Sequence, residues 1–95
     1  MVLKYGITEV CYNANNVIEK VKCGLIGFFN TIAVSEEQTK SIVIKNIEDG
    51  NIQYFTWVDN EKGAEVEVVT EGSNKYIRTK GNTEKKDNLG ELAKY

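Results

Sequence analysis

The chain has 95 residues, of which 41% are apolar and 27% are charged, and its formal net charge is −2. This length suits one small domain spanning residues 1–95. Such a domain hides little surface on folding, so we expect a homo-oligomer. The acidic balance excludes bulk binding to nucleic acid, which requires many basic side chains to neutralise phosphates. Nothing predicts a signal peptide or a membrane span, so we expect a cytoplasmic protein without membrane contact.

Charge is distributed unevenly along the chain. Residues 1–74 contain 6 basic and 11 acidic side chains, a net charge of −5. Residues 75–95 contain 6 basic and 3 acidic side chains, a net charge of +3. A basic C-terminal segment on an acidic body fits either a solvated charged surface or an anion-binding site.

The N-terminal part predicts a β-hairpin. Residues 5–12 and 17–24 are rich in strand formers and flank an asparagine-rich turn at 13–16. Alternation along the second strand puts Val17, Val21 and Cys23 on one face. Cys11 then lies roughly opposite Ile18, so no disulfide is expected. Both cysteines are predicted to be free thiols of a reducing compartment.

Residues 35–50 predict the main helix. Ser35 is a favourable N-cap, and Gln38 stands three positions later, as a capping box requires. Apolar residues follow at one-turn spacing, and Gly50 is placed to end the helix in a left-handed conformation. The apolar run 25–34 before the helix is ambiguous, since it continues the strand or forms an arm that contacts another chain.

The C-terminal half predicts three more strands. Residues 51–58 form one strand, and residues 64–70 and 75–80 form a hairpin about the turn at 71–74. Leu89 and Leu92 are expected to pin a short turn or helix to the core. The prediction is an α+β fold with a mostly antiparallel sheet of about five strands and one main helix on one face.

Symmetric pairing in the last hairpin assigns its side chains to two faces. Ile77 lies opposite Val68 on the core side. On the other side Arg78 lies opposite Glu67, and Lys80 lies opposite Glu65. Opposite charges across a ladder stabilise each other, so a cross-strand ion pair is the simpler explanation of Arg78.

A second explanation of Arg78 is a ligand site on the uncovered face of the sheet. One helix covers one face, so the other is expected to expose aromatic side chains of residues 51–58 beside Arg78. A planar ligand would stack on these rings while the guanidinium group holds a phosphate or carboxylate. The predicted ligand-binding residues are Phe55, Trp57, Tyr76, Arg78, Thr79, Lys80, Asn82 and Asn88.

Simpler structural roles exist for the polar members of this set. Asn82 and Asn88 are residues typical of turns. Asp87 or Asn88 also suits the N-cap of a short C-terminal helix. An oligomer contact is likewise a simpler explanation than a ligand for exposed aromatic residues.

The sequence lacks the groups that most enzymes need. It contains no histidine, which is the commonest general base at neutral pH. It has no GxSxG, P-loop or GxGxxG motif, and neither cysteine has a histidine partner. We therefore expect a non-enzymatic protein without a cofactor or a metal site.

The C-terminal motif Tyr76-Ile77-Arg78-Thr79, followed by Asp87-Asn88-Leu89, Leu92 and Tyr95, resembles the signature of a known family. It is the domain-of-unknown-function family numbered 3892, and the resemblance extends to the first strand and to the helix that ends at Gly50. Ala93 departs from the family pattern, which has proline there, and this loosens the geometry of the tail. The resemblance implies a fold and no activity.

The general character of the chain is also similar to phage proteins that sequester immune signals, such as the Thoeris anti-defence sponges for cyclic ADP-ribose-type molecules. No diagnostic motif of those proteins is present, so this similarity concerns character alone. Two hypotheses follow. The chain binds a small anionic, nucleotide-like ligand, or it is a protein-interaction or structural module that uses the same sheet face or the 25–34 arm.

Overall fold

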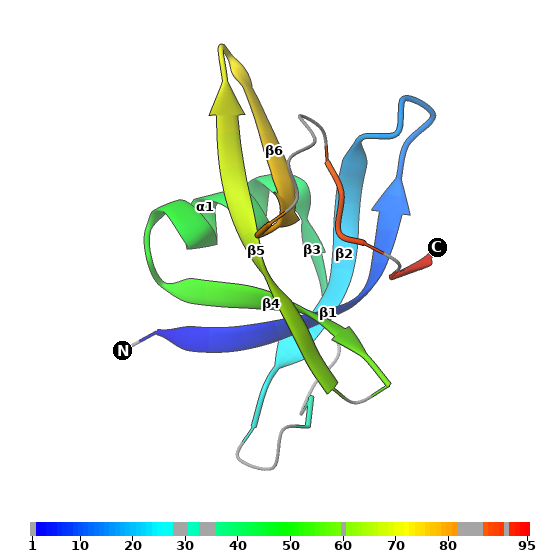
Figure 1. The fold of residues 1–95 in the computed structure, drawn as a ribbon, viewed down its shortest axis with the longest axis vertical. Helices are drawn as coiled ribbons and strands as arrows, with labels where there is room; N and C mark the ends of the chain where they lie inside the picture. Colours follow the sequence, from blue (N-terminus) through cyan, green and yellow to red (C-terminus); the bar gives the residue numbers. More distant parts are fainter. Residues whose placement is uncertain (1, 28–30, 33–35, 60, 82–86, 91) are drawn as a thin grey trace.

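The computed structural model describes residues 2–27, 31–32, 36–59, 61–81, 87–90 and 92–95. It is an α+β fold with one short helix and a mixed, mostly antiparallel sheet, as predicted (Figure 1). The elements are β1 (Leu3–Tyr12), β2 (Ile18–Leu25), β3 (Glu36–Thr39), α1 (Lys40–Glu48), β4 (Ile52–Val58), β5 (Glu61–Glu71), β6 (Asn74–Thr79) and β7 (Ala93–Lys94). No helix in the described part of the chain is long and apolar enough to span a membrane.

Strand β1 is the centre of the sheet. The strand order is β3-β2-β1-β4-β5-β6, and β7 pairs separately with β1. The N-terminal half of β1 pairs in parallel with β4, and its C-terminal half pairs in parallel with β7. The remaining pairings are antiparallel. Strands β3 and β7 are additions to the five predicted strands. The region of β3 was predicted to be part of the helix, and the region of β7 was predicted to form a short turn or helix.

The first hairpin forms as predicted, but its second strand faces differently. The register shifts between Cys11 and Tyr12, so that Cys11 lies opposite Lys20 and Tyr12 lies opposite Ile18. Ile18 is consequently buried, whereas Val17 is 39% exposed. The predicted alternation was wrong at this end because a bulge inserts an extra residue and reverses the faces beyond it. Both cysteines are free, as predicted.

Helix α1 begins five residues later than predicted. Residues 36–39 pair with β2 as the edge strand β3, and Thr39 is the N-cap, accepting a hydrogen bond from the amide of Ile42 at 3.4 Å. The predicted cap Ser35 lies outside the described residues. Gln38 belongs to β3, because sheet pairing supplies the hydrogen bonds that a longer helix would otherwise have made. Gly50 has a φ of 72° and ends the helix as predicted.

Tyr54 in β4 connects α1 to the sheet. Its ring is fully buried and lies 5.8 Å from the ring of Tyr5. Its hydroxyl donates to Oε1 of Gln38 at 2.6 Å and accepts from Nδ2 of Asn46 at 3.0 Å. Burial raises the pKa of Tyr54 to about 12, so the hydroxyl stays protonated and keeps donating. The helix thus covers the face of the sheet that carries Tyr54.

The C-terminal segment packs on the sheet through buried residues. Leu89 and Leu92 are buried, as predicted, but the described part of this segment forms strand β7 and an isolated bridge between Asn88 and Arg78 rather than a helix. Neither Asp87 nor Asn88 therefore caps a helix.

Asp87 is a buried carboxylate that joins three elements. Its side chain is 1% exposed. Oδ2 accepts from the amide of Ile18 at 2.9 Å and from Nζ of Lys40 at 2.7 Å, and Oδ1 accepts from the amide of Ile77 at 2.9 Å. The starts of β2 and α1 are thereby connected to β6. A buried carboxylate with three donors is stable because hydrogen bonds replace its lost hydration.

Asp87→Asn should destabilise the fold by about 3–5 kcal/mol. The amide cannot match three donors, and it leaves the ammonium group of Lys40 without its carboxylate. Urea unfolding followed by circular dichroism measures the loss. Asp59→Asn is the control, because Asp59 is exposed with a φ of 52° that asparagine also adopts, and it should change stability by less than about 0.5 kcal/mol. Equal effects of the two substitutions would contradict the role of Asp87.

Gly63→Ala should destabilise the pairing of β4 with β5. The register of this pair shifts between Phe55 and Trp57, and a Cβ on Gly63 would overlap Oγ1 of Thr56, which accepts from the amide of Ala64 at 3.1 Å. A loss of about 1–3 kcal/mol is expected in urea unfolding. The control Gly27→Ala meets nothing closer than 3.6 Å and should change stability by less than about 1 kcal/mol. Equal stability of the two variants would contradict the close approach.

Cys23 should resist alkylation in the native state. It is buried in the core, and burial, with a smaller contribution from the Glu36 carboxylate, raises the pKa of its thiol to about 12. Alkylation needs the thiolate, which is scarce at pH 9 for such a thiol. In Cys11→Ser, iodoacetamide should leave Cys23 unmodified at pH 9 until urea unfolds the protein, as mass spectrometry would show. Rapid labelling of Cys23 in the native protein would contradict this burial. The variant Cys23→Ser leaves Cys11 as the one thiol, so its labelling rate serves for comparison.

Candidate functional site

The aromatic residues predicted to form an open binding face are buried. Trp57 is 4% exposed and Phe55 is 9% exposed. A Cβ built on Gly6 would lie 3.0 Å from Cβ of Trp57 and 3.1 Å from Cδ1 of Ile32, so these side chains crowd one site. Ile32 is bridged to Ile26 beyond β2. The predicted exposure was wrong, because the chain after β2 returns over the face that the helix leaves open.

The ring of Phe55 has a cation beside it. Nζ of Lys62 lies 4.8 Å from the ring centre. Stacking of a planar ligand needs an open ring face, and the burial of Phe55 and Trp57 leaves little of either ring accessible. Ligand binding by Phe55 and Trp57 therefore stays a prediction, and their burial gives it no support.

The last hairpin has the predicted register. Arg78 lies opposite Glu67, and its Nε donates to Oε2 of that residue at 3.0 Å. Nζ of Lys80 donates to Oε1 of Glu65 at 3.0 Å. Both predicted cross-strand ion pairs are therefore present. Their existence gives these cations a structural role, and a ligand-binding role for them stays a prediction.

Thr79 and Asn88 meet at the outer edge of β6. The amide of Thr79 donates to the carbonyl of Asn88 at 3.1 Å, and the amide of Asn88 donates to the carbonyl of Ile77 at 3.0 Å. Oδ1 of Asn88 accepts from the amide of Gly90 at 2.8 Å, which is the turn-forming role expected of asparagine. The predicted residue Asn82 lies outside the described residues.

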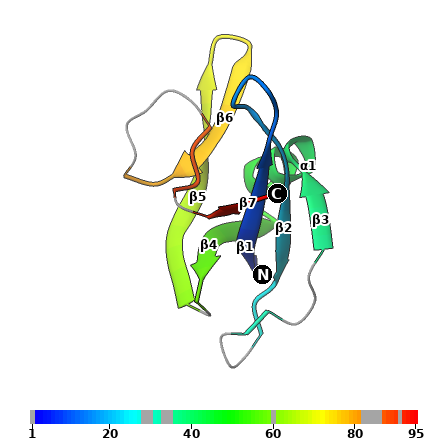
Figure 2. The same ribbon diagram turned by 90° about the vertical axis from the view of Figure 1, so that its right-hand side faces the viewer.

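A polar cleft lies between the two hairpins. The hairpins β1–β2 and β5–β6 project at the same end of the molecule, and residues 87–90 pass between them (Figures 1 and 2). The cleft measures about 670 Å³. The residues that line it come from both hairpins, from the start of α1 and from the C-terminal segment. They are Tyr12, Asn15, Asn16, Val17, Lys40, Asn74, Lys75, Tyr76, Asp87, Asn88, Gly90 and Lys94.

The cleft contains part of the predicted site. Tyr76 and Asn88 line it, whereas Phe55, Trp57, Arg78, Thr79 and Lys80 are not among its lining residues. Sequence reasoning missed the contribution of the first hairpin and of the three lysines. The sequence contains a signal for part of the cleft, because three asparagines gather in the turn at 13–16 and a fourth, Asn74, closes the turn at 71–74 on the other wall.

The asparagine-rich turn of the first hairpin builds one wall. Oδ1 of Asn13 accepts from the amides of Asn15 at 2.8 Å and of Val17 at 3.2 Å. Asn16 has a φ of 60°, a left-handed conformation that asparagine adopts more readily than most residues. The side chain of Asn13 thus fixes the turn, and the next two asparagines are left to face the cleft.

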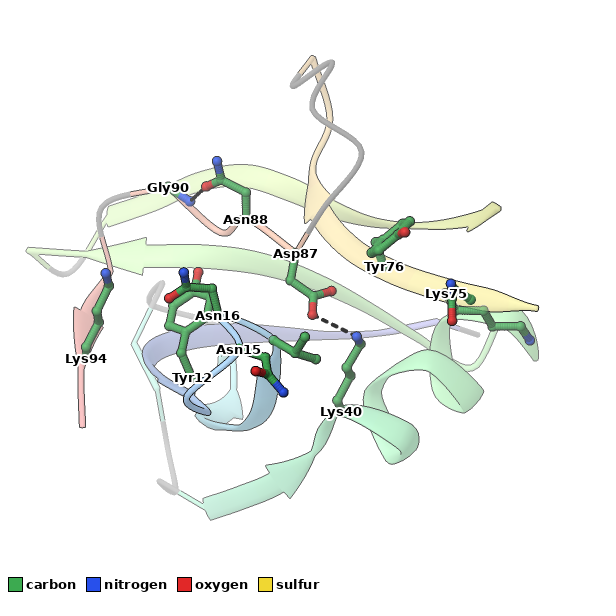
Figure 3. A pocket seen from close by; sticks show the side chains of 12 residues that line it. Tyr12, Asn15, Asn16, Lys40, Lys75, Tyr76, Asp87, Asn88, Gly90 and Lys94 are labelled. Carbon is green, nitrogen blue, oxygen red and sulfur yellow. Dashed lines mark hydrogen bonds and ion pairs between the residues drawn. The ribbon is translucent and has the colours of Figure 1, made fainter. Parts of the chain in front are cut away.

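Three lysines line the cleft, and their partners differ. Lys40 is paired with Asp87, as Figure 3 shows. Nζ of Lys75 contacts both carboxylate oxygens of Glu48, at 2.8 and 2.9 Å. Nζ of Lys94 lies 5.2 Å from the centre of the Tyr12 ring. Among the described lining residues, three carry a positive charge and one carries a negative charge.

The described lining residues carry groups that form hydrogen bonds and ion pairs. Apart from Val17 and Gly90, their side chains are amides, phenols, ammonium groups and one carboxylate, that of Asp87, which already accepts three hydrogen bonds. No group of three or more cysteine, aspartate or glutamate side chains in the described ranges could hold a metal ion. Amides and ammonium groups recognise hydroxyls and anions without reacting with them.

Comparison with known proteins identifies a family. The family model described as "Protein of unknown function (DUF3892)" matches residues 6–93, nearly the whole chain. No curated protein and no solved structure matches the chain. The family expected from the motif at 76–79 and the residues that follow it is thereby confirmed. The chain belongs to the DUF3892 family of proteins of unknown function.

Proposed function

We propose that this protein is a non-enzymatic binding module whose cleft takes a small anionic, nucleotide-like molecule. The observation that carries this proposal is the charge of the described cleft lining, in which Lys40 and Lys75 are paired with carboxylates and Lys94 lies beside the ring of Tyr12 instead. The cleft volume of about 670 Å³ lies in the range of small-molecule sites, which is about 300–1,000 Å³. An excess of cations in a concave site raises the local concentration of anions.

The uncharged lining residues suit the remainder of such a ligand. The half-buried side chain of Tyr76 and the ring of Tyr12 supply flat surfaces for a planar group. The four asparagine amides of the lining each offer a donor and an acceptor, which match sugar hydroxyls and base edges. These amides belong to Asn15, Asn16, Asn74 and Asn88.

Binding without reaction suits sequestration. A protein that holds a nucleotide-type signal reduces its free concentration without consuming it, which is the action of the phage sponges to which this chain is similar in character. We include this sponge-like role as the narrowest form of the proposal. Its support is that the described lining residues of the cleft include no pair of a nucleophile and a base.

The protein-interaction module and the homo-oligomer stay separate proposals. The face on which both were first expected carries buried rather than exposed aromatic rings. The cleft therefore has more support as the functional surface.

Ligand binding should appear as thermal stabilisation. Adenosine monophosphate, cyclic AMP and ADP-ribose are suitable first probes in differential scanning fluorimetry. A ligand at 100 times its dissociation constant should stabilise the fold by about 2.7 kcal/mol, which is roughly 10–20 °C for a domain of this size. Asn15→Trp places a large ring in the cleft and should abolish the shift.

Ala14→Trp is the matched control. Ala14 is exposed in the same turn and is not a lining residue, so this variant should keep the full shift. A shift that persists in Asn15→Trp would place the ligand elsewhere. No shift with any probe, together with a dimer in light scattering, would favour the protein-interaction module.

A further inference from the structure

The three cleft lysines differ in whether a nearby carboxylate compensates their charge. Because of this difference, one end of the cleft is more positive than the other. Lys40 lies 2.7 Å from a carboxylate oxygen of Asp87, and Lys75 lies 2.8 and 2.9 Å from those of Glu48. A carboxylate at such a distance cancels most of the field that an ammonium group exerts on a third charge. Neither lysine therefore adds much positive potential to the cleft.

Lys94 is the exception among the three. Within the described ranges, no carboxylate lies within ion-pair distance of its Nζ. Its neighbour is the ring of Tyr12, whose centre lies 5.2 Å from Nζ. An aromatic ring attracts an ammonium group through its quadrupole but leaves its unit charge in place. The uncompensated cation of the cleft is therefore at Lys94.

The backbone fixes the position of this lysine. Strand β7 pairs with β1, with Lys94 beside Val10, and the amide of Tyr95 donates to the carbonyl of Val10 at 3.1 Å. Side chains alternate along a strand, so Lys94 faces the cleft while Tyr95 faces the other way, where Lys22 lies 4.6 Å from its ring centre. Buried Leu92 fixes the strand from the preceding position.

Lys94 and Lys75 lie at opposite ends of the cleft, with Asp87 and Lys40 between them (Figure 3). Figure 3 also shows the ammonium group of Lys94 on the side where Gly90 lies. The ion pair of Asp87 and Lys40 in the middle is neutral as a whole, so it does not attract an anion there. One end of the cleft thus favours an anion, and the rest favours uncharged polar groups.

We infer that the anionic group of the ligand binds at the Lys94 end and that its uncharged polar body extends toward Asn74 and Tyr76. This inference rests on the proposed function and narrows it. The ligand class is a nucleotide-like molecule whose charge is concentrated at one end, as in a nucleoside monophosphate.

Inorganic phosphate is a probe for the anionic end alone. In the ¹⁵N-labelled protein, a phosphate titration should shift the amide resonances of Tyr12, Gly90 and Lys94 and leave those of Asn74 and Lys75 in place. Lys94→Gln should weaken the apparent phosphate affinity by about tenfold, because a charge-assisted contact is lost. Adenosine monophosphate should shift resonances at both ends.

Lys62→Gln is the matched control for Lys94→Gln. Lys62 is also an exposed lysine over an aromatic ring, 4.8 Å from the centre of Phe55, but it does not line the cleft. This variant should keep the phosphate affinity of the wild-type protein. Equal phosphate shifts at both ends, no phosphate shifts at all, or an unchanged affinity in Lys94→Gln, would overturn the inference.

A titration with adenosine monophosphate distinguishes failure of the Lys94 inference from failure of the proposed function. If the nucleotide shifts cleft resonances while phosphate does not act at Lys94, the binding role stands and the Lys94 anchor is refuted. If phosphate acts at Lys94 while adenosine monophosphate, cyclic AMP and ADP-ribose shift nothing in the cleft, the nucleotide-like ligand is refuted and the anion anchor stands.

Discussion

The buried carboxylate of Asp87 accepts hydrogen bonds from three separate parts of the chain. These are the start of β2, the first residue of α1 and the middle of β6. Asp87 and Lys40 line the cleft, and the other two donors, Ile18 and Ile77, each follow a lining residue in the chain, Val17 and Tyr76. The interaction that connects the elements therefore also holds the walls of the cleft together. A carboxylate in this position also neutralises Lys40, and this is why the charge of the cleft is concentrated elsewhere. The stability of the fold and the charge distribution of the cleft therefore both depend on Asp87.

Local patterns predicted the parts of the fold that local chemistry determines. The hairpin register about residues 71–74 followed from alternation and a short turn, and its cross-strand ion pairs are present. Gly50 ended the helix as expected, because a left-handed residue there needs no Cβ. The buried leucines of the C-terminal segment were also recognisable. Each of these features is decided by residues close in sequence.

The features that could not be predicted from the sequence are those that depend on contacts between residues far apart in the chain. Nothing near Glu36 indicates that β2 offers it a pairing edge, so the capping-box pattern of residues 35–38 placed the start of the predicted helix too early. The position of Ile32 beside Trp57 likewise depends on the path of the chain after β2. The cleft was missed for the same reason, since its described lining comes from four separated segments. The asparagines at 15, 16 and 74 are recognisable in the sequence as turn residues, but only the tertiary fold brings them to one cleft.

The connection between Ile18 and Asp87 spans 69 positions of the chain. During synthesis on the ribosome, the first hairpin emerges long before the carboxylate that accepts the amide of Ile18. Until then β1 also lacks its β7 partner, because that pairing joins the two ends of the sequence. Distant pairings of this kind slow folding and leave strand edges open to wrong partners. The first hairpin is thus open to wrong pairings until residues 87–94 have been made and have reached it.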